Sequence, residues 1–312
     1  MADMKKIATR DSYGKALAAL GEEFENLVVL DADLAGATKT GTFQKAFPAR
    51  HFDCGIAEAN MICIAAGMST TGLVPFASSF AMFAAGRAFE QVRNSIGYPH
   101  LNVKIGATHG GISVGEDGAS HQCCEDFALM RSIPGMVVMS PADDIEAKAM
   151  VRAAYLHEGP VYMRFGRAAV PVFHEEGFDF QIGKGEVLRD GSDVAIIANG
   201  LMTYEAITAA EQLSEAGIQA MVINMATIKP LDETLVLEAA KKCGKVITCE
   251  EHSVIGGLGE AVCAVLSEKL PTPVRRIGVN DEFGHSGPAG ALLKQFGLTA
   301  EHIVEVAKDL CN

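Results

Sequence analysis

The sequence predicts an α/β protein built from two doubly wound domains. Short apolar runs typical of buried strands alternate with helical stretches, which is the pattern of a mainly parallel sheet. This regularity fails once, between residues 169 and 185. The 312 residues are 49% apolar and 21% charged, enough for two domains of ordinary size. We therefore expect one domain over residues 1–175 and a second over residues 186–312.

The first domain is predicted to contain five strands and four helices. The strands cover residues 27–31, 73–76, 103–108, 136–140 and 161–165. The helices cover residues 12–20, 57–70, 80–95 and 143–157. The last helix has the clearest start signal, because Asp143 follows Ser140 and Pro141 and acidic residues occupy the first turn.

A linker and a second α/β series follow. Pro171, the acidic pair Glu175 and Glu176, and several glycines indicate an interdomain linker. The next strands are predicted over residues 194–198, 220–224, 246–250 and 274–278. Helices are predicted near residues 204–216, 234–243, 259–269, 289–296 and 301–310. Gly217 and Gly244 stand where helix C-caps are expected.

Charge and hydropathy limit the classes of partner. Lys and Arg number 26 against 39 Asp and Glu, a formal net charge of −13. Nucleic acid and anionic membranes need a basic face, so this balance argues against both, while a local patch for one small phosphate is allowed. Residues 1–10 carry no apolar signal region. The apolar stretches fall well short of the roughly 18 residues of a membrane span.

The eight cysteines indicate the compartment. No CxxC spacing occurs, and the adjacent Cys123 and Cys124 suit neither a disulfide framework nor a zinc site. We expect most cysteines to be small core residues in a reducing compartment, so the chain is predicted to be cytoplasmic. No metal site is predicted in this chain.

Polar residues stand at the ends of three predicted strands and in the loop after one of them. That loop, residues 110–118, is rich in glycine. The polar residues are Asp31, Asp33, His109, Asp117, His121 and Arg164. Because ligands bind at the carboxyl ends of strands in doubly wound sheets, we expect these side chains to converge on one rim.

Each of these residues also has a purely structural interpretation. Asp31 fits better as a helix cap or as a residue at the end of the sheet. Arg164 suits an ion pair and a phosphate site equally well. The segment from Gly115 to Gly118 is compatible with a simple turn. His109 and His121 favour a site, because both flank the glycine-rich loop.

Glu58 and two phenylalanines form a second group of candidates. Glu58 begins a predicted helix, where a carboxylate stabilises the helix dipole by about 0.3–1 kcal/mol. The functional alternative is a partly buried carboxylate available for proton transfer. Phe80 and Phe83 lie three residues apart at the predicted opening of another helix. Taken alone, such an aromatic pair is typical of a core.

Together these residues resemble the C-terminal half of the transketolase family, over nearly the whole chain. The segment from Gly55 to Met61 looks like the one that bears the glutamate for thiamine diphosphate. Residues 79–83 are similar to the aromatic pocket for the aminopyrimidine ring. Residues 107–109 and 114–122 resemble the family's substrate loop almost residue for residue, and residues 283–287 resemble its C-terminal domain.

The resemblance implies a role for each candidate. Glu58 would hydrogen-bond the pyrimidine nitrogen and activate the cofactor, and His109 and His121 would bind the donor sugar and relay protons. The residues implied to bind the cofactor are Glu58, Phe80, Phe83, Ile112 and Asp33. The residues implied to bind the substrate are Arg10, His109, Asp117, His121 and Arg164, with the two arginines at the phosphate end.

The sequence lacks the family's diphosphate site. That site is a Gly-Asp-Gly motif followed by Asn about thirty residues later, and it positions Mg²⁺ through oxygen ligands. Here residues 115–118 read Gly-Glu-Asp-Gly and already match the substrate loop. The resemblance therefore implies a split transketolase of the pentose phosphate pathway. A separate N-terminal subunit would carry the diphosphate and magnesium ligands, in an α2β2 heterotetramer.

The chain departs from the family at several positions. The Arg before the family glutamate and the His after it are Ala57 and Ala59 here. A phosphate-binding Ser is replaced by Ala37, with Thr38 and Lys39 as the two candidates to replace it. An aromatic residue one turn after Phe83 is a glycine.

Three other functions were weighed against transketolase. A 1-deoxyxylulose-5-phosphate synthase shares the glutamate segment but differs at residues 108–111, where this chain reads Thr-His-Gly-Gly. The β subunit of a 2-oxoacid dehydrogenase is a stand-alone chain of similar size. His109 with Asp117 and His121 favours sugar chemistry over both. The third is a non-catalytic α/β module, against which the intact Glu58 and loop argue.

Overall fold

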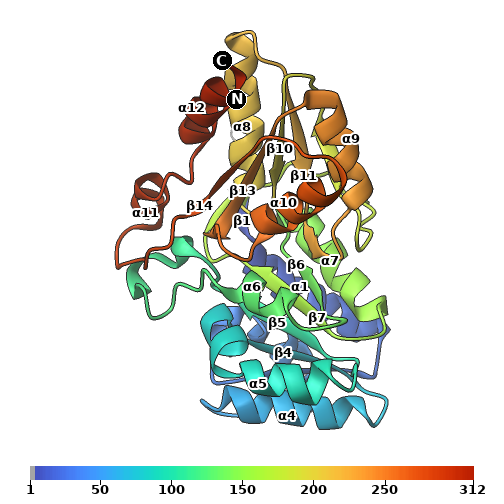
Figure 1. Ribbon diagram of the computed structural model, residues 1–312. Helices are drawn as coiled ribbons and strands as arrows, with labels where there is room; N and C mark the ends of the chain where they lie inside the picture. The colour runs from blue at the N-terminus through green and yellow to red at the C-terminus, as the bar shows by residue number, and fades with distance from the viewer. Residues whose placement is uncertain (1–3) are drawn as a thin grey trace.

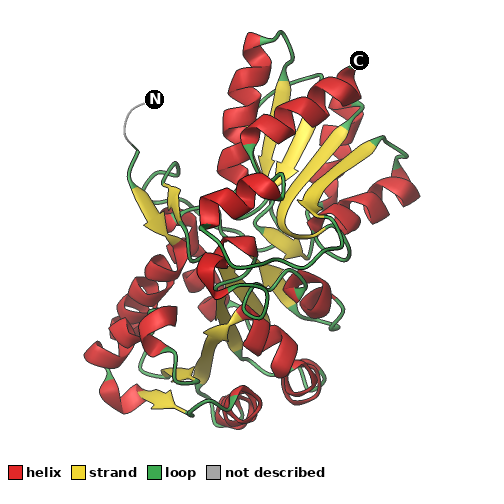
Figure 2. Cartoon of the chain, turned by 90° about the vertical axis from the view of Figure 1, so that its left-hand side faces the viewer, coloured by secondary structure: helices red, strands yellow, loops and turns green. Residues whose placement is uncertain are grey.

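The computed structural model describes residues 4–312; residues 1–3 of the expected first domain lie outside the described part. Two α/β domains lie one above the other along the long axis of the molecule (Figure 1). The first half of the chain forms one domain, and most of the second half forms the other. Figure 2 shows helices on both faces of each sheet. The predicted α/β class with two doubly wound sheets is confirmed.

The first sheet has seven strands. Their spatial order is β12 (Thr227–Lys229), β6 (Val137–Met139), β7 (Val161–Phe165), β5 (Lys104–Thr108), β4 (Val74–Phe80), β2 (Leu27–Asp31) and β3 (His51–Asp53). All neighbouring pairs are parallel except β12 with β6. The two strands predicted over residues 27–31 and 161–165 have these bounds in the structure.

Alternate residues of β2 face two different helix layers. Leu27 and Val29 pack with residues of α1 (Thr9–Glu23) and α7 (Asp144–Leu156). Val28 and Leu30 instead pack with Met61 and Ala65 of α4 (Glu58–Ser69) on the other face. A central strand that is apolar on both faces is the signature of a parallel sheet covered on both sides.

One predicted helix of the first domain is wrong at its start. Residues 80–95 were expected to be helical, but β4 continues to Phe80, which pairs with Thr108 of β5. The run is fully buried from Val74 to Phe80, so ladder pairing outweighs helix propensity there. Two π-helical segments, Met82–Arg87 and Val92–Gly97, then flank α5 (Phe89–Gln91). Such π segments occur often at functional sites.

The second sheet has five strands. Their order is β14 (Val274–Val279), β13 (Val246–Ser253), β10 (Val194–Ala198), β11 (Ala220–Asn224) and β9 (Glu186–Arg189). The longer helices around it are α8 (Met202–Glu215), α9 (Glu233–Cys243), α10 (Leu258–Lys269), α11 (Ala289–Gln295) and α12 (Ala300–Cys311). Gly244 is the left-handed C-cap of α9, and Gly217, with φ of 83°, follows α8, as their positions predicted.

Several short elements were not predicted. The strands are β1 (Lys6–Ala8), which pairs with β8 (Ala169–Pro171), together with β3, β9 and β12. The short helices are α2 (Ala35–Thr38), α3 (Gly41–Ala46) and α6 (Asp126–Arg131). β12 comes from the second half of the chain but extends the first sheet through β6. Strands of three or four residues carry too few alternations for a periodicity argument.

Among residues 4–312, no helix is both long and apolar enough to cross a membrane.

His174 joins the linker to both halves of the chain. Its side chain is 3% exposed, with Nδ1 3.1 Å from Asp143 and Nε2 2.8 Å from Glu186. Asp143 also caps α7 by accepting from the Glu146 amide at 3.0 Å. Burial alone would lower the pKa of His174, but the two carboxylates raise it to about 10. The imidazolium therefore stays charged at neutral pH and stabilises the fold.

We predict that His174→Gln lowers the free energy of unfolding by about 1–3 kcal/mol, because two carboxylates lose a charged donor. The folded pKa of His174 lies above its unfolded value of 6.5. The stabilisation is therefore fully present below pH 6.5 and is lost as pH rises toward 10. Thermal unfolding of both proteins from pH 6 to 9.5 measures this. A difference that stays constant or grows with pH contradicts the assignment.

Candidate active site

The site lies at the carboxyl edge of the first sheet, where β2, β4 and β5 end. At the end of β2, Asp31 is fully buried and accepts from the backbone amides of Ala32 and Leu34. It also accepts from the hydroxyls of Thr38 at 2.9 Å and Thr40 at 2.5 Å. Burial raises its pKa to about 6. Asp31 is thus a residue that closes the loop after β2, as its structural interpretation predicted.

Four aromatic rings cluster at the ends of β4 and β5. Phe80 stacks on His109, with ring centroids 3.9 Å apart, and lies 5.9 Å from Phe83. The edge of His121 faces Phe83 at 5.3 Å. These residues come from β4, the first π segment and both ends of the glycine-rich loop. Together they form an aromatic wall, in which the rings of Phe80 and Phe83 are near-parallel, at 17°, and suited to contact with a planar heterocycle.

Glu58 lies at the start of α4 and is 2% exposed. Arg87, at the end of the first π segment, donates to both carboxylate oxygens at 3.0 Å. The same guanidinium lies 4.5 Å from the centre of the Phe83 ring. Sequence reasoning missed Arg87, because only the chain path after β4 brings it opposite Glu58.

His109 is kept neutral by its surroundings. It follows β5 with φ of 59° and is 2% exposed. Arg10 lies 3.0 Å from Nε2, and Thr108 Oγ1 lies 2.8 Å from Nδ1. Because a guanidinium can only donate, Nε2 accepts and Nδ1 carries the proton. Burial, followed by the nearby positive groups Arg10, Arg167, His121 and Lys39, lowers the pKa of His109 to about 3.

A basic groove opens beside His109. It has a volume of about 530 Å³. Its positively charged lining residues are Lys5, Lys6, Arg10, Lys15, Lys39 and Arg167. Burial and Arg167 both lower the pKa of Arg10, although Asp11 acts in the opposite direction. In a chain of net charge −13, such a local concentration of positive charge favours an anion.

Asp33 and Asp117 lie at the surface near this rim. Asp33 has φ of 60°, and its amide donates to Asp53 Oδ1 at 3.0 Å. Asp117 is exposed at the end of the 3₁₀ turn Ile112–Asp117. Both carboxylates can therefore reach a ligand that approaches from solvent.

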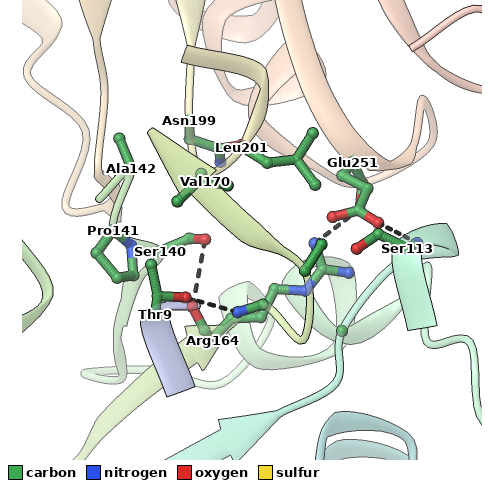
Figure 3. A pocket seen from close by; sticks show the side chains of 14 residues that line it. Thr9, Ser113, Ser140, Pro141, Ala142, Arg164, Val170, Asn199, Leu201 and Glu251 are labelled. Carbon is green, nitrogen blue, oxygen red and sulfur yellow. Dashed lines mark hydrogen bonds between the residues drawn. The ribbon is translucent and has the colours of Figure 1, made fainter. Parts of the chain in front are cut away.

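Two predicted site residues are not brought to the rim. Ile112 is fully buried in the core of the second domain, beside Gly284. Arg164 is 5% exposed and pairs with Asp126, with Nε 3.1 Å from Oδ2. It also donates to the carbonyl of Glu251 (Figure 3). A further guanidinium nitrogen donates to the carbonyl of Cys123. In this structure Arg164 has the ion-pair role of its two interpretations.

Arg167 takes the position at the rim that the sequence analysis gave to Arg164. It follows β7 by two residues, has a side chain that is 35% exposed, and donates to the carbonyl of Val114 at 2.5 Å. The position of each arginine relative to the end of β7 could have distinguished the two residues. Arg164 lies within β7 and is drawn into the core, whereas a residue in the following loop faces the carboxyl edge.

The residues present fit one half of thiamine diphosphate. Glu58 and the aromatic wall offer a carboxylate and flat apolar surface, which suit an aminopyrimidine ring. Within residues 4–312, no group of three or more His, Cys, Asp or Glu side chains is arranged to bind a metal ion.

Comparisons with known proteins agree with this geometry. The family model for the transketolase pyrimidine binding domain matches residues 5–172, and the model for the transketolase C-terminal domain matches residues 183–303. A transketolase C-terminal section from Methanocaldococcus jannaschii is 53% identical and covers 95% of this chain and 94% of that protein.

Two further relatives are close in length to this chain. A 6-deoxy-6-sulfo-D-fructose transketolase subunit from a Clostridium species is 43% identical and covers 96% of this chain and 94% of that protein. A solved structure, described as a split gene transketolase in an inactive β4 tetramer, is 54% identical. It has a TM-score of 0.92 and covers 98% of both chains.

We predict that Arg164→Leu lowers the free energy of unfolding by about 3–5 kcal/mol, since it leaves Asp126 buried without its cation. Arg167→Leu is the matched control, because its side chain is 35% exposed, and it should lower stability by less than about 1 kcal/mol. Thermal unfolding of both variants measures the difference. Equal stability of the two variants contradicts the structural role of Arg164.

Proposed function

The chain belongs to the transketolase family, and on that premise we propose that it is the pyrimidine-binding subunit of a split transketolase. The enzyme would move a two-carbon ketol unit from a ketose phosphate to an aldose phosphate. In this proposal residues 1–175 form the pyrimidine-binding domain and residues 186–312 the transketolase C-terminal domain. The observation that carries it is the buried Glu58 beside the aromatic wall, next to the basic groove.

Thiamine diphosphate supplies the electron sink that makes carbon–carbon cleavage next to a carbonyl feasible. Glu58 would share a proton with the pyrimidine ring nitrogen, which a carboxylate in a water-poor site can do. Arg87 now pairs with that carboxylate, so this contact has to open or shift when the ring binds. Phe80 and Phe83 would orient the ring.

The chain would bind the sugar through the loop and the groove. His109 is neutral, so it can donate or accept a hydrogen bond without bringing a second charge. His121 and Asp117 would contact the donor hydroxyls. Arg10, Arg167 and Lys39 would bind the anionic end of the substrate.

Of the two candidates to replace the phosphate-binding Ser, the contacts favour Lys39. The hydroxyl of Thr38 is buried and donates to Asp31, so it is occupied. The Lys39 side chain is 35% exposed and lines the groove, where its Nζ lies 3.4 Å from the partly exposed carboxylate of Asp11. An ammonium binds a terminal phosphate or sulfonate through charge, with less dependence on geometry than a hydroxyl.

We propose that an N-terminal transketolase subunit completes the site, in an α2β2 heterotetramer. It would bring the diphosphate and Mg²⁺ ligands, which need hard oxygen donors in near-octahedral order. The relative described as an inactive β4 tetramer is consistent with a requirement for a second chain. The eight free cysteines suit a reducing compartment, so we place the enzyme in the cytoplasm, in the pentose phosphate pathway.

We predict that this chain alone, with thiamine diphosphate and Mg²⁺, does not transfer ketol units from xylulose 5-phosphate, because half of the cofactor site is missing. Adding a separate chain with the Gly-Asp-Gly and Asn motif should restore turnover. A coupled assay of the aldose product measures this. Robust turnover by the purified single chain would overturn the split-enzyme proposal.

We predict that Glu58→Gln lowers ketol transfer by about a hundredfold or more, because an amide cannot exchange the proton of a general acid–base group. Assembly with the partner subunit should stay normal. Deuterium exchange at C2 of the bound cofactor, followed by NMR, reports the activation step directly.

Glu90→Gln is the matched control, since Glu90 is an exposed carboxylate on α5, near Arg87 in sequence. It should exchange at the wild-type rate. If Glu58→Gln also exchanges C2–H as fast as the wild type, Glu58 is only a helix-start residue and the cofactor proposal fails.

A further inference from the structure

A carboxylate of the second domain reaches the glycine-rich loop of the first. Glu251 lies on β13 and is 6% exposed. Its Oε1 accepts from the Ser113 amide at 2.5 Å, as Figure 3 shows on the right of the cavity. This bond links positions 138 residues apart in sequence. It is therefore a contact that only the packing of the two domains creates.

The first residues of the loop lie between Glu251 and Arg164. A Cβ on Gly111, whose φ is 81°, would lie 2.3 Å from Glu251 Cδ. A Cβ on Gly110 would lie 2.0 Å from Arg164 Nε. Arg164 itself donates to the main-chain carbonyl of Glu251 at 2.7 Å. The path of the loop is consequently set by two buried charged side chains, which leave no room for any residue but glycine.

The loop has free space on one side. A small cavity of about 20 Å³, room for about one water, borders Ser113, Asn199 and Glu251. The Nδ2 atom of Asn199 is buried and has no hydrogen-bond partner among the described residues. Within the first domain, Gly111 N donates to the Cys123 carbonyl at 2.7 Å and Gln122 Nε2 donates to the Ile112 carbonyl at 3.2 Å. The bond from Ser113 to Glu251 adds a hydrogen bond that holds this part of the loop to the second domain.

The loop also carries the substrate-facing residues. His109 immediately precedes Gly110, and Asp117 and His121 lie toward the far end. That end is tied to the second domain as well, since Gln122 Nε2 donates to the His285 carbonyl at 3.1 Å. A displacement at Ser113 would thus be transmitted to the side chains on both flanks of the loop.

We propose that Glu251 is a positioning residue for ketol transfer, through which the C-terminal domain sets the shape of the substrate loop. The inference rests on the proposed function. Glu251 touches neither cofactor nor sugar and acts through the Ser113 amide. The essential property is an acceptor oxygen of the right reach, so Gln should replace Glu while Ala should not.

The test uses the reconstituted two-subunit holoenzyme. In Glu251→Ala, we expect KM for the ketose phosphate to rise about tenfold, the scale of one lost buried hydrogen bond, with cofactor affinity unchanged. Hydrogen exchange of the amides at residues 110–118 should become faster. Glu251→Gln should restore both properties to near wild-type values.

Glu250→Ala is the matched control on the same strand. Its carboxylate accepts from the Leu258 and Gly259 amides at the start of α10, so its loss should lower stability without changing loop exchange or KM. If Glu251→Ala does not fold, Glu251→Asp, which shortens the reach by one methylene, replaces it.

Wild-type KM and wild-type loop exchange in a folded Glu251 variant would overturn the inference, as would Gln behaving like Ala. The exchange measurement needs no turnover. If the wild-type complex lacks ketol transfer, the proposed function fails. Hydrogen exchange at residues 110–118 still measures whether Glu251 restrains the loop.

Discussion

The rest of the site depends on the ion pair and hydrogen bonds of one buried guanidinium, that of Arg164, at the junction of the two domains. Arg164 pairs with Asp126, whose Oδ2 also accepts from the Tyr162 hydroxyl at 2.8 Å. Its remaining nitrogens donate to carbonyls of the loop segment and of the second domain. A buried ion pair repays its desolvation only when its other donors are also bonded. Strand, loop and second sheet must therefore meet in one arrangement around Arg164.

That arrangement explains how an acidic chain presents a positive site. The buried carboxylates of Asp126 and Glu251 lie near the Arg164 guanidinium, which offsets their negative charge inside the protein. The groove beside His109 instead collects Arg10, Lys39 and Arg167. Burial, and then the field of these cations, lowers the pKa of His109 to about 3, so the imidazole remains neutral while its surroundings stay positive. A neutral histidine in a positive groove is suited to the hydroxyl and carbonyl oxygens of an anionic sugar.

The α/β fold and part of the candidate site could be predicted from the sequence, because apolar strands, polar residues at strand ends and glycine-rich loops form a recognisable pattern. His109 and His121 converge as expected, since both flank the loop that follows a strand end. Phe80 and Phe83, expected at the opening of a helix, join them because β4 continues to Phe80. Arg164 and Ile112 are buried rather than exposed at the rim. Residue type alone does not tell whether a side chain near a strand end points to the rim or to the core. Arg87 and Glu251 were missed for a related reason. Each meets its partner only through tertiary packing, across 29 and 138 residues respectively.

The central claim is that this chain supplies the pyrimidine half of a thiamine diphosphate site and a second chain supplies the rest. The most direct measurement is a structure of the two-subunit complex with thiamine diphosphate and Mg²⁺. We predict a Glu58 oxygen within about 3 Å of a pyrimidine ring nitrogen. The diphosphate and Mg²⁺ should be contacted only by the partner subunit. A cofactor whose diphosphate is bound by this chain, or whose pyrimidine lies away from Glu58, would contradict the account.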